Sequence, residues 1–207
     1  MGKPAKKLFL AKPLKLDLGC GKNKVGPEWT GVDSRKFEGV DLVLDLCVRL
    51  GSRESPPFRL EDCGKLAPWP WESDSVEEVH CSHFVEHLEP DERIHFANEL
   101  FRILKPGATA RIITPHWNSM RAYGDLTHKW PPVSEFWFHY LNKAWRDVNA
   151  PHNDQYTCDF EAPAVLALVF GQGFMDRNDE MKHFAAYYYR EGATDLIATL
   201  TKPAEPR

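Results

Sequence analysis

Short apolar segments alternate with turn-forming residues along the first half of the chain. Four of these segments have the length and composition of strands: residues 14–18, 29–33, 40–46 and 76–81. Residues 110–114 form a fifth expected strand, which we predict to be buried.

A helix is predicted between the fourth and fifth strands, at residues 90–104. Its apolar positions are three and four residues apart and form one face: Ile94, Ala97, Leu100, Phe101 and Leu104. Lys105-Pro106-Gly107 ends it, because proline and glycine do not continue a helix. Residues 180–190 also have helical character, and residues 195–201 are predicted to form a final edge strand. The sequence does not place a strand within residues 162–174.

This alternation predicts an α/β fold, a Rossmann-like doubly wound sheet that is mostly parallel with an antiparallel C-terminal edge strand. In such a sheet, ligands bind beyond the carboxyl ends of the strands. The length of 207 residues favours one domain, residues 1–207. We distinguish within it a basic N-terminal lead (1–13), an insertion (47–67) and an aromatic segment (116–160).

The charge and cysteine content of the chain indicate which kinds of partner and which location to expect. The net charge is -4, so the chain has no general attraction to a phosphate backbone, and nucleic-acid binding is disfavoured. The five cysteines are odd in number and show no C-x-x-C spacing, which indicates a reducing, cytoplasmic location rather than a disulfide or zinc framework. No apolar run approaches the ~20 residues of a membrane span, and we expect no membrane association.

The turn after the first strand is rich in glycine. Leu16-Asp17-Leu18 is followed by Gly19-Cys20-Gly21, and glycines tolerate positive φ and allow close approach of a ligand to the backbone. A dinucleotide fingerprint would need a third glycine where Lys24 stands, which argues against a nicotinamide-linked oxidoreductase. The alternative is a plain strand-to-loop turn.

Asp33 ends the second predicted strand. A carboxylate at this tip can accept hydrogen bonds from both hydroxyls of a ribose. Taken alone, an acid at a strand end is more often a helix cap or a solvated turn residue. Its place after the glycine turn favours ribose binding.

Four segments in order resemble the class I S-adenosylmethionine-dependent methyltransferases, most closely their type 11-like branch. The segments are Asp17-Leu18-Gly19-Cys20-Gly21, Gly31-Val32-Asp33, Ser82-His83-Phe84-Val85-Glu86-His87-Leu88 and Arg102-Ile103-Leu104-Lys105-Pro106-Gly107. Together they span residues 14–115, about half of the chain.

The resemblance implies S-adenosyl-L-methionine as cofactor and a role for each matching residue. The backbone around Asp17, Gly19, Cys20 and Gly21 would hold the methionine part of the donor, and Asp33 would hold its ribose. Ser82 would face the reactive end of the donor.

An acid after the third strand would accept a hydrogen bond from the adenine amino group. Asp45, followed by Leu46, is the favoured candidate because it ends the predicted strand. Asp62, inside the insertion, is the alternative.

His83, Glu86 and His87 form an H-x-x-E-H pattern, which zinc proteases of the inverted type carry on a helix. Here the pattern starts at a strand end rather than within a helix. We therefore expect Glu86 and His87 to be structural and predict no metal ion.

The segment after the fifth strand is unusually aromatic, with eleven aromatic or histidine side chains within residues 116–145. In a methyltransferase this is where an acceptor-binding insertion usually lies; the alternative is a lid that only excludes water. Asp125 and His128 belong to it, and we predict that they act with His83 as catalytic residues.

The expected reaction is methyl transfer to an unidentified small-molecule acceptor. Alternatives are a non-catalytic S-adenosylmethionine-binding module, or a nucleic-acid or protein methyltransferase. A non-catalytic module need not bind the donor, so a calorimetric titration with the donor separates it from the enzyme. The sequence does not indicate the oligomeric state.

Overall fold

The protein is built on one seven-stranded sheet with the order β3-β2-β1-β4-β5-β7-β6. The computed structural model describes residues 13–50, 65–161 and 164–205. The strands are β1 (Lys15–Leu18), β2 (Thr30–Asp33), β3 (Leu42–Val43), β4 (Val76–Ser82), β5 (Leu104–Pro115), β6 (Val165–Phe170) and β7 (Ala193–Thr201). The first five strands are parallel to one another, and β7 is antiparallel to both β5 and β6.

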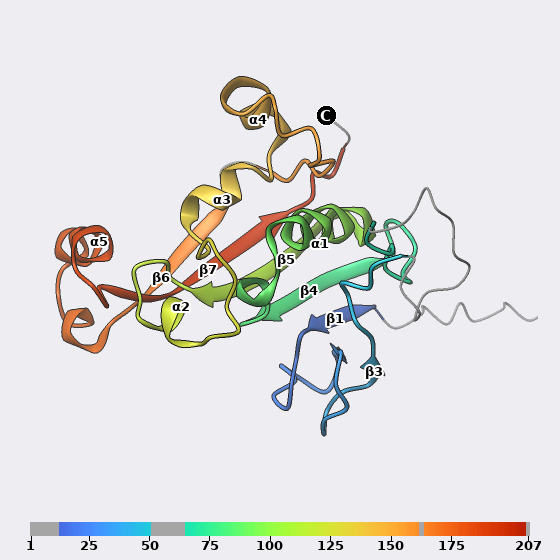
Figure 1. Cartoon of the computed structure of the whole chain (residues 1–207), viewed down its shortest axis with the longest axis horizontal. Coiled ribbons are helices and arrows are strands. Elements are labelled where there is room, and N and C mark those ends of the chain that lie inside the picture. The colour runs from blue at the N-terminus through green and yellow to red at the C-terminus, as the bar shows by residue number, and fades with distance from the viewer. Residues whose placement is uncertain (1–12, 51–64, 162–163, 206–207) are drawn as a thin grey trace, which may run out of the picture.

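Within the described residues, five helices accompany this sheet: α1 (Pro90–Ile103), α2 (Arg121–Gly124), α3 (Glu135–His139), α4 (Lys143–Asn149) and α5 (Asp179–Tyr188). Two single 3-10 turns, η2 (Val85–His87) and η3 (Gln172–Phe174), complete the described secondary structure. Strands β1 to β3 occupy one end of the sheet, and β6 with α5 occupies the other (Figure 1).

The predicted Rossmann-like α/β sheet is confirmed, with differences at its margins. The third strand is only Leu42–Val43, shorter than residues 40–46, and β5 already begins at Leu104, directly after α1. The C-terminal strand β7 lies one place inside the edge, and β6 is the edge strand. β6 was missed because its run VLALVF lacks the alternation that separates a strand from a helix.

Helices are absent from two of the described connections. Eleven residues join Leu18 to Thr30 and eight join Asp33 to Leu42, and neither connection contains a helix. A parallel crossover generally needs a dozen or more residues to fit one. The chain instead fixes these short connections with carboxylate side chains, which also shape the candidate site.

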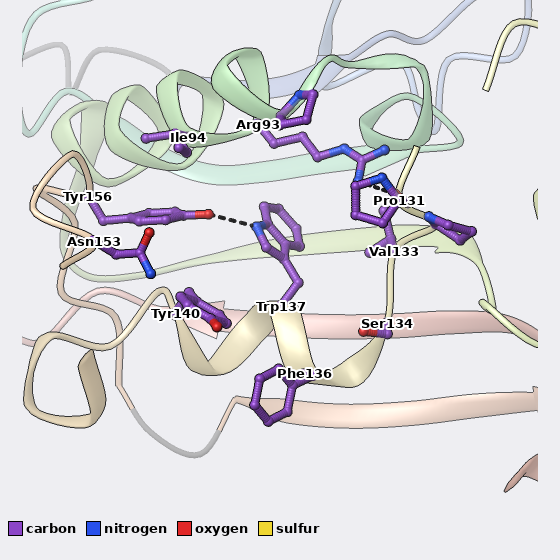
Figure 2. Close-up of a pocket in the computed structure, with 12 residues that line it drawn as sticks. Arg93, Ile94, Pro131, Val133, Ser134, Phe136, Trp137, Tyr140, Asn153 and Tyr156 are labelled. Carbon is purple, nitrogen blue, oxygen red and sulfur yellow. Dashed lines mark hydrogen bonds between the residues drawn. The ribbon is translucent and has the colours of Figure 1, made fainter. Parts of the chain in front are cut away.

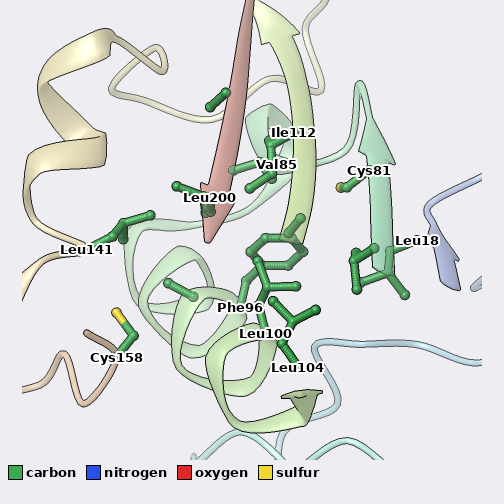
Figure 3. Close-up of a cluster of buried hydrophobic side chains, with 14 of the residues drawn as sticks. Leu18, Cys81, Val85, Phe96, Leu100, Leu104, Ile112, Leu141, Cys158 and Leu200 are labelled. Atoms are coloured by element: carbon green, nitrogen blue, oxygen red, sulfur yellow. The ribbon is translucent and has the colours of Figure 1, made fainter. Parts of the chain in front are cut away.

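Helix α1 supplies one side of the core. Pro90 stands in its first turn, and the backbone N–H of Glu89 donates to the Glu92 carboxylate at 2.9 Å, which satisfies a donor at the helix start. Its buried face, which includes Phe96 and Leu100, packs on the sheet between Leu18, Ile112 and Leu200 (Figure 3).

The predicted insertion at residues 47–67 is closed at its base. Leu50 N donates to Lys65 O at 2.6 Å and Ala67 N donates to Val48 O at 2.8 Å, on either side of an antiparallel bridge. Asp62 lies outside the described residues. Among the described helices, none has both the length and the apolar character needed to cross a membrane.

A matched pair of leucines tests this core. Leu100 is fully buried and Leu126 is 98% exposed. We expect Leu100→Ala to lower the free energy of unfolding by about 2–5 kcal/mol, because it leaves a cavity, and Leu126→Ala to change it by less than about 0.5 kcal/mol. Urea unfolding measures both, and equal losses would contradict the packing described.

Candidate functional site

The residues predicted to bind ligands follow the carboxyl ends of β1, β2, β4 and β5. These strands are parallel neighbours, so their carboxyl ends lie along one edge of the sheet. The structure therefore brings the glycine turn, Asp33, Ser82 and the segment after Pro115 to one edge, as the sequence predicts.

The glycine turn has a backbone that only glycine adopts easily. Gly19 and Gly21 have φ values of 68° and 53°. A Cβ on Gly19 would lie 2.6 Å from the Phe84 ring, whereas a Cβ on Gly21 would meet nothing within 4 Å. The turn thus packs tightly on Phe84 at Gly19 and leaves open space at Gly21.

The backbone amides of this turn are committed to the protein. The N–H groups of Gly19 and Cys20 donate to Val32 O at 2.8 and 3.2 Å, and that of Gly21 donates to the Asp33 carboxylate at 3.0 Å. The turn therefore offers a ligand a close backbone surface rather than three free amide donors.

The Asp17 side chain fixes the loop that follows β1. Its side chain is 2% exposed and accepts from Val25 N at 2.8 Å, and its other oxygen lies 3.0 Å from Nδ1 of His80. In this arrangement the Asp17 carboxylate supports the turn, and only its backbone belongs to the surface that a ligand would meet.

Asp33 links the turn to the tip of β2. One carboxylate oxygen accepts from Gly21 N at 3.0 Å and the other from Arg35 N at 2.9 Å. An ionised carboxylate has about four acceptor positions, so both oxygens can accept a further hydrogen bond. Asp33 is half-buried, which suits a group that holds a ligand at the surface.

Asp45 lies two residues beyond β3, not at its end as predicted, because the strand stops at Val43. The Asp45 side chain is exposed and accepts from Cys47 N at 2.9 Å, whereas Leu46 is buried and its carbonyl accepts from the Trp69 indole at 3.0 Å. Asp45 is thus open to a ligand, and Leu46 anchors the segment beneath it.

His83 follows Ser82 in a left-handed conformation, with φ of 54°. Its Nδ1 lies 3.1 Å from Oε1 of Glu86, and its Nε2 lies 3.9 Å from Oδ1 of Asp195 on β7. Arg121 donates to the other oxygen of Asp195 at 2.7 Å. The hydrogen bond to Glu86, the largest cause, raises the pKa of His83.

A cleft of about 700 Å³ lies beside His83. His83, Arg121, Asp125 and His128 line it, together with Glu86 and His87. Nε2 of His128 is 3.9 Å from Oδ2 of Asp125. The structure thus brings the three predicted catalytic residues to one cleft, at the carboxyl ends of β4 and β5.

The aromatic segment also lines a second hollow, which has no lining residue in common with this cleft. Tyr140, Trp137 and Tyr156 line a pocket of about 370 Å³ against α1, with the Trp137 indole donating to the Tyr156 hydroxyl at 3.2 Å (Figure 2). Other aromatic side chains of the segment pack on one another, as Trp145 does on Phe136 and Tyr140.

Several residues of this site escaped the sequence analysis. Arg93 looks like a solvated position of an amphipathic helix, yet it is 5% exposed. Asp195 belongs to a strand and reaches the site only because β7 pairs with β5 and places it opposite Pro115. The sequence did offer one signal for Asp195, which is the single acidic residue in the run DLIATLT of apolar residues and threonines.

Comparisons with known proteins show one family match and a shared fold. Residues 16–112 match the model of a family described as "Methyltransferase domain". The fold is similar to that of a SAM-dependent methyltransferase from Archaeoglobus fulgidus, at 17% identity and a TM-score of 0.54, over 94% of this chain and 88% of that one. A SAM-dependent methyltransferase structure from Methanosarcina mazei matches at 16% identity and a TM-score of 0.51, over 95% and 96% of the two chains. No curated protein matches.

The contact between Gly19 and Phe84 can be tested with a glycine control. Gly107 also has positive φ, 79°, but a Cβ there would meet nothing within 4 Å. Both alanine substitutions carry the backbone cost of about 1–2 kcal/mol. Gly19→Ala must also displace the Phe84 ring, so we expect it to lose about 1–3 kcal/mol more in urea unfolding. Equal losses would contradict the close packing.

Proposed function

We propose that this chain, a class I S-adenosylmethionine-dependent methyltransferase, methylates a small molecule bound in the cleft beside His83. The match to the methyltransferase family covers residues 16–112. The observation that carries the proposal is the convergence of His83, Asp125 and His128 on that cleft, at the strand ends next to the glycine turn. The aromatic segment at residues 116–160 is then the acceptor side of a single domain.

The glycine turn and Asp33 fit the donor. A Cβ would fill the open space at Gly21, so the backbone there can approach a ligand closely. The amides of the turn are committed, so its carbonyl groups are the ones that suit an ammonium group. Asp33 retains acceptor capacity for ribose hydroxyls, and exposed Asp45 is placed to accept from an adenine amino group.

The bound donor supplies a methyl group activated by its sulfonium. The work of the chain is therefore mainly to position, which can contribute ~7–11 kcal/mol to lowering the barrier. His83 stands at the end of β4, where its imidazole lines the cleft and can take up a proton that the acceptor loses. Glu86 fixes the orientation of that imidazole through Nδ1.

A small acceptor suits the cleft in size and polarity. Its volume of about 700 Å³ lies within the range of about 300–1,000 Å³ of small-molecule sites. Its wall carries Arg121, Asp125 and histidines rather than a basic stripe, which disfavours a nucleic acid. The free thiols of Cys20, Cys47, Cys81 and Cys158 favour the cytoplasm as the compartment.

Donor binding tests the assignment of Asp33. We expect Asp33→Ala to weaken binding of S-adenosylhomocysteine by about 10- to 150-fold, the equivalent of about 1.5–3 kcal/mol for charge-assisted hydrogen bonds. Asp41→Ala is the matched control, because the Asp41 carboxylate likewise accepts from a nearby backbone amide, Gly31 N of β2 at 2.8 Å. Isothermal titration calorimetry measures both. An equal loss in the two variants would mean that Asp33 acts only through the loop.

Turnover tests the acceptor side. Once an acceptor is found by screening for S-adenosylhomocysteine release, Asp125→Asn and His128→Ala should each reduce kcat at least about tenfold while donor affinity stays nearly unchanged. If the segment is only a lid, donor affinity and turnover change together or not at all.

A further inference from the structure

Three side chains with metal-ligating atoms meet at the floor of the cleft. Glu86 and His87 belong to η2, and His128 lies forty-one residues further along the chain, beyond α2. One ligand atom from each of the three lies within 4.8 Å of the others. Glu86 and His87 were expected to be structural because their H-x-x-E-H pattern starts at a strand end, and the sequence gives no sign that His128 lies beside them.

The hydrogen bonds of both imidazoles leave Nε2 with a lone pair. Nδ1 of His128 is 3.2 Å from the carbonyl oxygen of Ala122, which can only accept, so the proton sits on Nδ1. The Thr127 hydroxyl donates to Asp125 at 2.7 Å and lies 2.9 Å from Nδ1 of His87, from which it must then accept. Metal-binding histidines are oriented by such bonds to carbonyl or polar oxygens.

Glu86 contributes a buried oxygen that nothing in the described chain satisfies. The residue is 4% exposed; Oε1 lies near His83, and Oε2 has no hydrogen-bond partner among the described residues. An unpaired buried carboxylate oxygen is costly, and native structures rarely keep one without an ion or a water nearby. A bound cation would satisfy it.

The two segments that carry the ligands are fastened to each other. Lys129 N donates to Glu86 O at 2.8 Å. The buried Arg93 guanidinium donates to the carbonyls of Glu86 at 3.4 Å and Lys129 at 3.0 Å. The ligand cluster is therefore held before any ion arrives, as a binding site requires.

We propose that Glu86, His87 and His128 bind one divalent transition-metal ion. Two imidazoles and a carboxylate suit zinc and its neighbours, whereas magnesium prefers oxygen ligands alone. In a tetrahedral site with bonds of about 2.1 Å, two ligand atoms lie about 3.4 Å apart. Atoms that are now within 4.8 Å of one another reach that spacing when each side chain moves by under about 1 Å.

The ion defines the class of acceptor. Three protein ligands would leave the fourth position of a tetrahedral ion open, where an acceptor oxygen or nitrogen would bind and lose its proton more readily. The acceptor is thus a small molecule with a metal-binding hydroxyl, carboxylate or amine. This consequence for the acceptor rests on the proposed function; the metal site itself does not.

Zinc titration of the full chain tests the site. After treatment with EDTA and its removal, we expect calorimetry to show one Zn²⁺ bound per chain, with no competition from Mg²⁺. His87→Ala and His128→Ala should each weaken Zn²⁺ binding at least about tenfold. His152→Ala is the matched control, because His152 is exposed and lies outside the cluster, and it should bind like the unmodified chain.

Parallel titration with S-adenosylhomocysteine keeps the outcomes distinct. A chain that binds S-adenosylhomocysteine but no Zn²⁺ overturns the metal site and leaves the proposed function standing. Zinc binding that survives in both histidine variants overturns the assignment to these ligands. Glu86→Gln keeps the size of the side chain but removes its charge, and it should also weaken Zn²⁺ binding. In each variant, retained binding of S-adenosylhomocysteine shows that the protein is folded.

Discussion

The buried guanidinium of Arg93 holds together the two segments that form the functional cleft. It donates to the carbonyls of Val85 at 3.2 Å and Glu86 at 3.4 Å on one side, and to those of Lys129 at 3.0 Å and Pro131 on the other. A buried arginine is stable only when its donors are paired, so these four carbonyls fix one arrangement of the two segments. Because Arg93 lies on α1, the site is tied to the main core.

The proposed donor side of the edge depends on carboxylates in a similar way. The connections after β1 and β2 have no helix in the described chain, and Asp17, Asp33 and Asp41 hold their loops by accepting from the amides of Val25, Gly21 and Gly31. Side chains thus replace the helices that usually order such loops. Asp33 consequently has two roles, since it stabilises the turn and remains available to a ligand.

Much of this arrangement follows from local sequence patterns. The three- and four-residue spacing of α1 and the glycine turn after β1 predict the helix, the first strand and the donor side, because both signals are contained within a few residues. The pairing of β7 between β5 and β6, the burial of Arg93 and the approach of His128 to Glu86 depend on contacts between distant segments. The H-x-x-E-H spacing was visible in the sequence, but its third partner was not.

The central claim is that the glycine turn and the histidine cluster belong to one site, with the donor on one side and a metal-bound acceptor on the other. The most direct measurement is a crystal structure of the chain with S-adenosylhomocysteine and Zn²⁺, with anomalous diffraction at the zinc edge. The account predicts ligand density against Gly21 and Asp33 and one anomalous peak between Glu86, His87 and His128. Ligand density away from the carboxyl ends of β1 and β2, or an anomalous peak only elsewhere, would contradict it.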